Sequence, residues 1–277
     1  MSDISINIIR ETGGVTRKGF GTVLILANTA HDYSIYEDLA SLSEDFATDT
    51  TVYAMAQTLM SQDLQPEEFA VAGIDYEAGV DAVTDLSAFL DTLVQDSKDF
   101  YFVATEADDE PSQEEVSSWA GAYAKLHFVR TDVLPSASTV STWGSNTSIY
   151  YTTQADEYPE MAMLGRGAPR DAGSQTWKNA ELATITPEAL SGTTLTELED
   201  ERYNVVVNSY GRIVTSNGFL QGNLYIDQQR SEDYIDIRLE EDVAKLFINN
   251  DKVPYDDSGI AQVASVFESR LNQAFRQ

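Results

Sequence analysis

The first part of the chain alternates short apolar runs with amphipathic stretches. Four apolar runs predict β-strands: residues 20–27, 69–74, 100–105 and 126–130. Four amphipathic stretches predict helices: residues 36–46, 51–61, 80–95 and 112–123, the last of which opens on a capping-box spacing between Ser112 and Glu115. Strands that alternate with helices are typical of a largely parallel sheet with right-handed crossovers. We therefore expect an α/β domain over residues 19–130.

Residues 131–176 break this alternation. They are rich in Ser, Thr, Gly and Tyr and contain the segment GRGAPRDAG at residues 165–173. We expect a long connection with some short β structure. Residues 177–277 then predict a smaller mixed α+β domain, in which Thr186 and Pro187 begin a short helix. Its other predicted elements are strands at residues 203–210, 212–215 and 222–226, and helices at residues 196–202, 232–248 and 259–276.

Each of the two closing helices carries an apolar stripe, and we expect both stripes to face the core. The stripes are Ile235, Leu239, Val243, Leu246 and Phe247 on the first helix and Ile260, Val263, Ala264, Phe267, Leu271, Ala274 and Phe275 on the second.

Residues 1–18 predict an extended arm ahead of the first domain. Isoleucines alternate with polar residues, as in a strand with one apolar face, until two glycines at positions 13 and 14 end the pattern. Such a strand either joins the chain's own sheet or pairs with the sheet edge of another subunit. The residues that would carry this pairing are Ile4, Ile6, Ile8 and Ile9.

The charge of the chain is strongly negative. The 277 residues include 17 Lys and Arg against 46 Asp and Glu, which gives a net charge of −29 spread along the whole length. Phosphate backbones repel such a surface, so we expect no nucleic-acid partner. Salt at about 1 M shortens the Debye length to about 3 Å and screens the self-repulsion. The composition therefore favours a protein that works in concentrated salt, with an ordinary acidic mesophilic surface as the alternative.

Motifs of catalysis, cofactor binding and metal binding are weak or missing. The chain has no Cys, no GxxxxGK[ST] and no GxSxG, and its histidines are His31 and His127. His127 lies inside an apolar strand, as core histidines do, and His31 follows the first strand without an obvious nucleophile. Acidic clusters at residues 108–110 and 256–257 lack the spacing of a calcium loop and are interpreted as solvated surface. No cofactor or metal is expected, and an α/β enzyme that uses His31 stays as an alternative.

The sequence also lacks the marks of a membrane protein. It has no apolar run of about 18 residues. Its first 14 residues lack the basic and apolar regions of a secretory signal. We therefore expect no membrane insertion.

Two long segments together carry a family resemblance. The first is GGVTRKGFGTVLILANTAHDYSIYEDLASLSEDFATDTTVYAMAQTLMSQ, and the second begins at TWKNAELATITPEAL and runs through LTELEDERYNVVVNSYGRIVTSNGF to the last helix. Both resemble the contractile-tail sheath proteins of tailed viruses. Members of that family usually continue past the last helix into strands and a C-terminal arm. This sequence ends at Gln277, so either that arm is missing here or its role is met differently.

The resemblance implies a structural protein and no enzyme. Sheath subunits form stacked hexameric rings that wind as a helical sleeve around a tail tube, and contraction drives the tube into the host. The implied partners are copies of the chain itself, the tail tube protein, and the baseplate and tail terminator proteins, in a virion tail assembled in the host cytoplasm. The resemblance places Arg238, Glu241, Asp242 and Lys245 in a helix that faces the tube. A non-sheath virion part, such as a baseplate or adhesin module, is the alternative.

Overall fold

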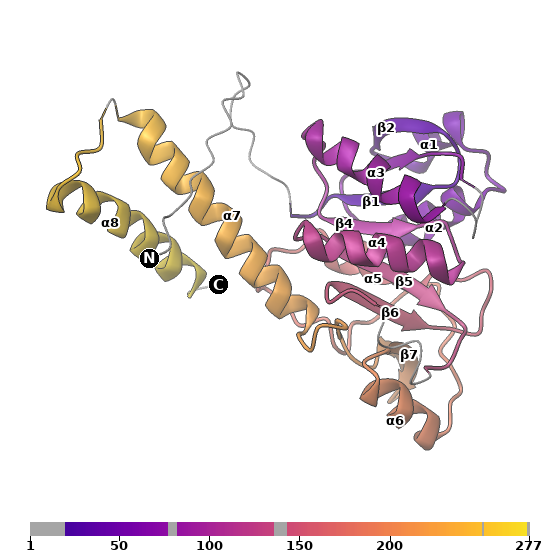
Figure 1. Ribbon diagram of the computed structural model, residues 1–277. Helices are drawn as coiled ribbons and strands as arrows, with labels where there is room; N and C mark the ends of the chain where they lie inside the picture. The colour runs from indigo at the N-terminus through magenta and orange to yellow at the C-terminus, as the bar shows by residue number, and fades with distance from the viewer. Residues whose placement is uncertain (1–19, 77–81, 136–142, 251, 276–277) are drawn as a thin grey trace.

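The computed structural model of the protein describes residues 20–76, 82–135, 143–250 and 252–275 (Figure 1). The predicted arm at residues 1–18, with Ile4, Ile6, Ile8 and Ile9, lies outside these residues. None of the helices within the described ranges combines the length and apolar composition needed to cross a bilayer.

The described residues form a sheet whose strands follow the order β2-β3-β1-β4-β5-β6-β7-β8. Neighbouring strands are parallel except at the two ends of the sheet, where β2 is antiparallel to β3 and β8 is antiparallel to β7. The prediction of a largely parallel α/β fold is therefore confirmed. The strands are β1 (Val23–Ala27), β2 (His31–Tyr36), β3 (Phe69–Gly73), β4 (Phe102–Thr105), β5 (Leu126–Thr131), β6 (Thr147–Tyr151), β7 (Asn204–Ser209) and β8 (Arg212–Thr215).

Helices cover both faces of the central strands, which explains why β1 and β3 carry no polar side chain. Along β1, Val23 and Ile25 belong to one buried cluster with α2 and α5, whereas Leu24 and Leu26 belong to another with α3 and α4. The helices are α1 (Leu39–Asp45), α2 (Thr51–Met60), α3 (Ala82–Gln95), α4 (Glu110–Ala122), α5 (Pro159–Gly167), α6 (Gly192–Asp200), α7 (Ile226–Asn249) and α8 (Asp257–Ala274).

Several predicted boundaries are wrong for local reasons. Ser112 does not cap α4, because Asp109 precedes it and accepts the Ser112 N–H at 3.0 Å. No helix forms at Thr186, since Ser191 is the residue that caps the following helix, α6. The strand expected at residues 222–226 is reduced to one isolated bridge, and α7 begins there at Ile226.

The long connection expected at residues 131–176 contains regular structure. The predicted short β structure is β6, but α5 was not predicted. The sheet passes from β5 through β6 into β7 and so crosses residues 130 and 176 without interruption. The division of the chain into domains at those two positions stays a prediction.

Helices α7 and α8 form a hairpin that extends away from the sheet (Figure 1). The first turns of α7 pack on the body of the protein, and its second half and α8 pack on each other. The prediction that the apolar stripes of these two helices face the core is therefore wrong. Ile260 on α8 is 67% exposed and Phe247 on α7 is 45% exposed, whereas Arg230 on α7 is buried.

Candidate functional site

A buried arginine holds the foot of the hairpin against the body. Arg230 is 2% exposed and donates to the carbonyl oxygens of Gly167 at 3.1 Å, Ala168 at 3.0 Å and Phe20 at 2.7 Å. The first two carbonyls end α5, where the helix dipole is negative and favours a cation. Burial lowers the pKa of Arg230 to about 10, so the side chain stays charged at neutral pH. This contact fixes where α7 leaves the body.

A second buried contact lies one turn further along α7. The Tyr101 hydroxyl, next to β4, donates to Asp233 at 2.7 Å, and Gln229 donates to the other carboxylate oxygen at 2.9 Å. Burial raises the pKa of Asp233 and raises that of Tyr101 well above its ordinary value. The hydrogen bonds satisfy groups that burial would otherwise penalise.

The segment GRGAPRDAG, expected to be a loop, builds the surface that receives α7. Gly167 lies so close to Trp177 that a Cβ atom on it would be 2.5 Å from the indole ring. A Cβ atom on Gly165 would be 2.1 Å from the carbonyl oxygen of Leu59 in α2. Both positions need glycine because the neighbouring groups approach the backbone directly.

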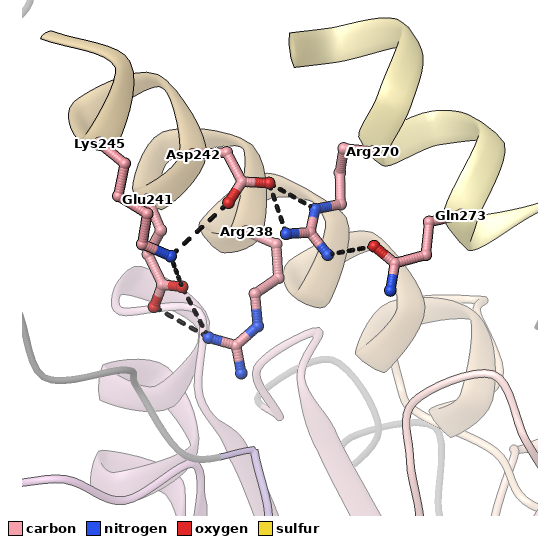
Figure 2. A network of polar contacts seen from close by, with 6 residues as sticks. All are labelled: Arg238, Glu241, Asp242, Lys245, Arg270 and Gln273. Atoms are coloured by element: carbon pink, nitrogen blue, oxygen red, sulfur yellow. Dashed lines mark hydrogen bonds and ion pairs between the residues drawn. The ribbon is translucent and has the colours of Figure 1, made fainter. Parts of the chain in front are cut away.

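The four residues predicted to face a tube lie together in the structure (Figure 2). Arg238 donates to both carboxylate oxygens of Glu241, at 2.9 and 2.8 Å, and both side chains are nearly buried. Lys245 is half-exposed and its Nζ lies 3.6 Å from Asp242 Oδ1. Contact of these residues with a tail tube stays a prediction.

Arg270 joins this network from α8. Its Nε donates to Asp242 Oδ2 at 2.8 Å, its Nη2 contacts the same oxygen, and its Nη1 donates to Gln273 at 3.0 Å (Figure 2). Because Asp242 lies on α7, this ion pair fixes the two helices of the hairpin to each other. Sequence reasoning missed Arg230 and Arg270, since a single arginine on a helix carries no signal of what it contacts.

Beyond this network the hairpin exposes large apolar side chains. We call them the apolar hairpin surface; their exposed fractions run from 40% to 109%, and they are Phe247, Ile248, Tyr255, Ile260, Phe267, Leu271 and Phe275. Exposed apolar side chains of this size are candidates for contact with another molecule where they form one patch. Half of the large apolar side chains that the described residues expose lie on the hairpin.

The two histidines take part in packing. The His31 ring lies 2.9 Å from the Tyr36 hydroxyl, which donates to Asp45 at 2.6 Å, so β2 is tied to the end of α1. His127 is fully buried in β5, as its apolar surroundings predicted, and burial lowers its pKa to about 3.

The two acidic clusters cap helices. Asp109 caps α4, and Asp256 caps α8 by accepting from Ser258 and Gly259 at 3.0 and 3.1 Å. Within the ranges that the structure describes, no three His, Asp or Glu side chains come together as metal ligands would.

Side chains of the protein occupy the carboxyl edge of the sheet where the connections from β1 and β4 diverge. Nucleotides bind open α/β sheets at such a position. Here Glu106 accepts from the Asn28 N–H at 2.7 Å, Asn28 accepts from the Tyr76 N–H at 3.3 Å, and Asp75 accepts from the Ala30 N–H at 3.2 Å. The first bond joins the loops that follow β1 and β4, and the other two join the loops that follow β1 and β3.

No protein-family model matches the sequence, and no curated protein matches it either. Solved structures do match the fold. A chain in the cryo-EM structure of the anti-feeding prophage baseplate, symmetrised six-fold, has a TM-score of 0.75 at 12% identity, over 100% of this chain and 84% of that one. A chain in the cryo-EM structure of the anti-feeding prophage helical sheath in the contracted state has a TM-score of 0.72 at 13% identity, over the same shares.

A crystal structure shows the same likeness from a bacterial protein. The sheath tail protein from Desulfitobacterium hafniense has a TM-score of 0.56 at 8% identity, over 88% of this chain and 82% of that one. The chain thus shares its fold with chains from structures of the anti-feeding prophage baseplate and helical sheath and with a sheath tail protein.

Proposed function

We propose that this protein is a structural subunit of a contractile tail sheath. The observation that carries the proposal is the likeness to a chain of the anti-feeding prophage helical sheath, which extends over 100% of this chain. In this role the subunit polymerises as stacked hexameric rings around a tail tube, and contraction drives the tube into a host cell. Its partners are other copies of the chain, the tube protein, and the baseplate and terminator proteins of a virion tail.

The apolar hairpin surface supports a polymerising role. Leu271 is 49% exposed and Phe275 is 92% exposed in a lone subunit. Burying a fully exposed apolar side chain contributes about 1.5–3 kcal/mol, and the half-buried Leu271 would gain only part of that. A hairpin that extends from the body can reach a neighbouring copy without disturbing the sheet. The predicted arm with Ile4, Ile6, Ile8 and Ile9 would add strand pairing between copies, and Lys245 is the exposed member of the tube-facing set.

A baseplate subunit is the second candidate. Two of the similar chains belong to structures of the anti-feeding prophage baseplate, one of them in the contracted state. A baseplate part would form a closed ring of fixed size, whereas a sheath subunit would form tubes of variable length. The two roles therefore differ in what the purified chain assembles into.

The experiment compares polymerisation of the full chain with that of hairpin variants. Leu271→Ser/Phe275→Ser removes two exposed apolar side chains of α8, and Tyr210→Ser is the matched control because Tyr210 is fully exposed at the turn between β7 and β8. We expect the wild type and the control to form tubes in about 1 M salt, where repulsion between acidic copies is screened. The double variant is expected to stay a folded monomer by circular dichroism and electron microscopy. Tubes formed equally well by the double variant would contradict the assignment of the interface.

Deletion of residues 1–10 tests the arm separately. The deleted chain is expected to keep the melting temperature of the wild type and to lose polymerisation, because the pairing strand is removed. Normal sleeves after the deletion would refute the role of the arm in pairing between copies and would not affect the proposed hairpin interface.

A further inference from the structure

Three arginines line one cavity at the foot of α7. The cavity has a volume of about 320 Å³, and its charged lining consists of Arg170, Arg230, Arg238 and Asp171. Phe20 and Tyr234 form part of its apolar wall. Arg170 and Asp171 belong to the GRGAPRDAG segment, in which Gly165 and Gly167 serve packing.

The sign of this cavity is opposite to that of the chain. Lys and Arg number 17 against 46 Asp and Glu, yet three of those 17 cations meet here with a single carboxylate in the lining. A cleft whose lining carries more cations than carboxylates attracts anions, although here Asp171 and the pairing of Arg238 with Glu241 offset part of the charge. This cavity is therefore a place where an anion is attracted to a protein that otherwise repels anions.

The three guanidinium groups differ in how they are used. Arg230 donates to backbone carbonyls, and Arg238 donates to Glu241. The guanidinium of Arg170 makes no hydrogen bond or ion pair with any residue in the described part of the chain, and its Nε is buried without an acceptor. A buried donor without an acceptor costs free energy, so an acceptor supplied from outside the subunit would stabilise this arrangement.

A carboxylate fits the chemistry of the cavity. A guanidinium group binds a carboxylate through two parallel hydrogen bonds, and such charge-assisted bonds are stronger than neutral ones. Every further copy of this chain brings 46 acidic side chains, and general repulsion between copies opposes polymerisation unless specific attractions offset it. We propose that the cavity around Arg170 binds an acidic side chain of a second copy of this chain. This inference rests on the proposed sheath function and names one of its contacts.

The test uses Arg170→Gln, which removes the charge and keeps a polar, though shorter, side chain. Arg212→Gln is the matched control, because Arg212 lies on β8 with its side chain 72% exposed and paired with Glu181 at 3.0 Å. Pelleting assays would measure the concentration above which each chain polymerises. We expect this critical concentration to rise about tenfold for Arg170→Gln and to stay unchanged for Arg212→Gln, with equal melting temperatures for both. Arg170→Glu would repel a carboxylate, and we expect it to raise the critical concentration above that of Arg170→Gln.

The outcomes separate this inference from the sheath proposal. A wild type that never polymerises contradicts the sheath function itself. Polymerisation of Arg170→Gln and Arg170→Glu at the wild-type concentration overturns only the cavity contact. Inorganic phosphate tests whether the cavity binds a small free anion instead. In that case phosphate raises the melting temperature of the monomeric wild type and not that of Arg170→Gln, and Arg170→Gln polymerises normally. This combination of results would show that the proposed contact between copies is wrong.

Discussion

Acidification tests the buried state of His127. The side chain lies in β5 between β4 and β6, is fully buried, and has no hydrogen-bond partner for either ring nitrogen in the described part of the chain. Burial lowers its pKa to about 3, against 6.5 for an exposed histidine. Between these two values the unfolded chain binds a proton that the folded chain does not. The stability is therefore intact above pH 6.5 and falls as the pH decreases toward 3.

The size of this effect follows from proton linkage. At pH 5 the unfolded histidine is almost fully protonated and the folded one is neutral, which lowers the free energy of unfolding by about 2 kcal/mol relative to pH 7.5. His127→Leu removes the titrating group from an apolar site and should abolish this decrease in the free energy of unfolding. Urea unfolding of both chains at pH 7.5 and pH 5.0 in constant salt measures the decrease. Since both chains carry the same 46 acids, the titration of those acids largely cancels in the comparison. An equal loss in wild type and His127→Leu would refute a neutral buried histidine.

Three further predictions concern other parts of the molecule. Burial raises the pKa of Glu160 in α5 from 4.5 to about 7, so the folded state loses stability as the pH rises from 4.5 through 7. Acidification from pH 8 to pH 5 should therefore restore about 2.5 kcal/mol in the wild type and not in Glu160→Gln, as the same urea titrations measure. Arg230→Met leaves three backbone carbonyls without their donor and should lower the free energy of unfolding by about 3–5 kcal/mol in urea; a loss under 1 kcal/mol would contradict the anchoring role. The melting temperature should rise between low salt and about 2 M salt, because screening weakens self-repulsion at a net charge of −29. Calorimetry that finds a constant or falling melting temperature would contradict the interpretation that the protein works in concentrated salt.

The sequence predicts strands well where both faces of the strand are buried. The strands near Ile25 and Val71 are apolar at every position because helices cover both faces, and such runs are recognised without a structure. Strand β2 was missed because, as an edge strand, it carries polar residues such as Asp32 and Ser34. Helix α5 was missed because it is buried on nearly all sides and contains glycines, which removes the amphipathic period.

At the candidate site, the helical period of the sequence predicts the helices but not which groups they contact. The helical spacing of α7 and α8 was right, but their apolar stripes meet each other and solvent and not the core, since the hairpin leaves the body. The spacing of Arg238, Glu241 and Lys245 places them on one side of a helix. It cannot show that Arg270, 28 residues beyond Asp242, completes the network. Tertiary contacts of that kind depend on the turn between the two helices, which has no periodic signal.

The most direct test of the sheath proposal is electron microscopy of the purified full-length chain in about 1 M salt. We expect tubes built of stacked six-fold rings, with the α7–α8 hairpin of each copy in contact with its neighbours. Monomers at every concentration, or rings in which the hairpin contacts only solvent, would contradict it.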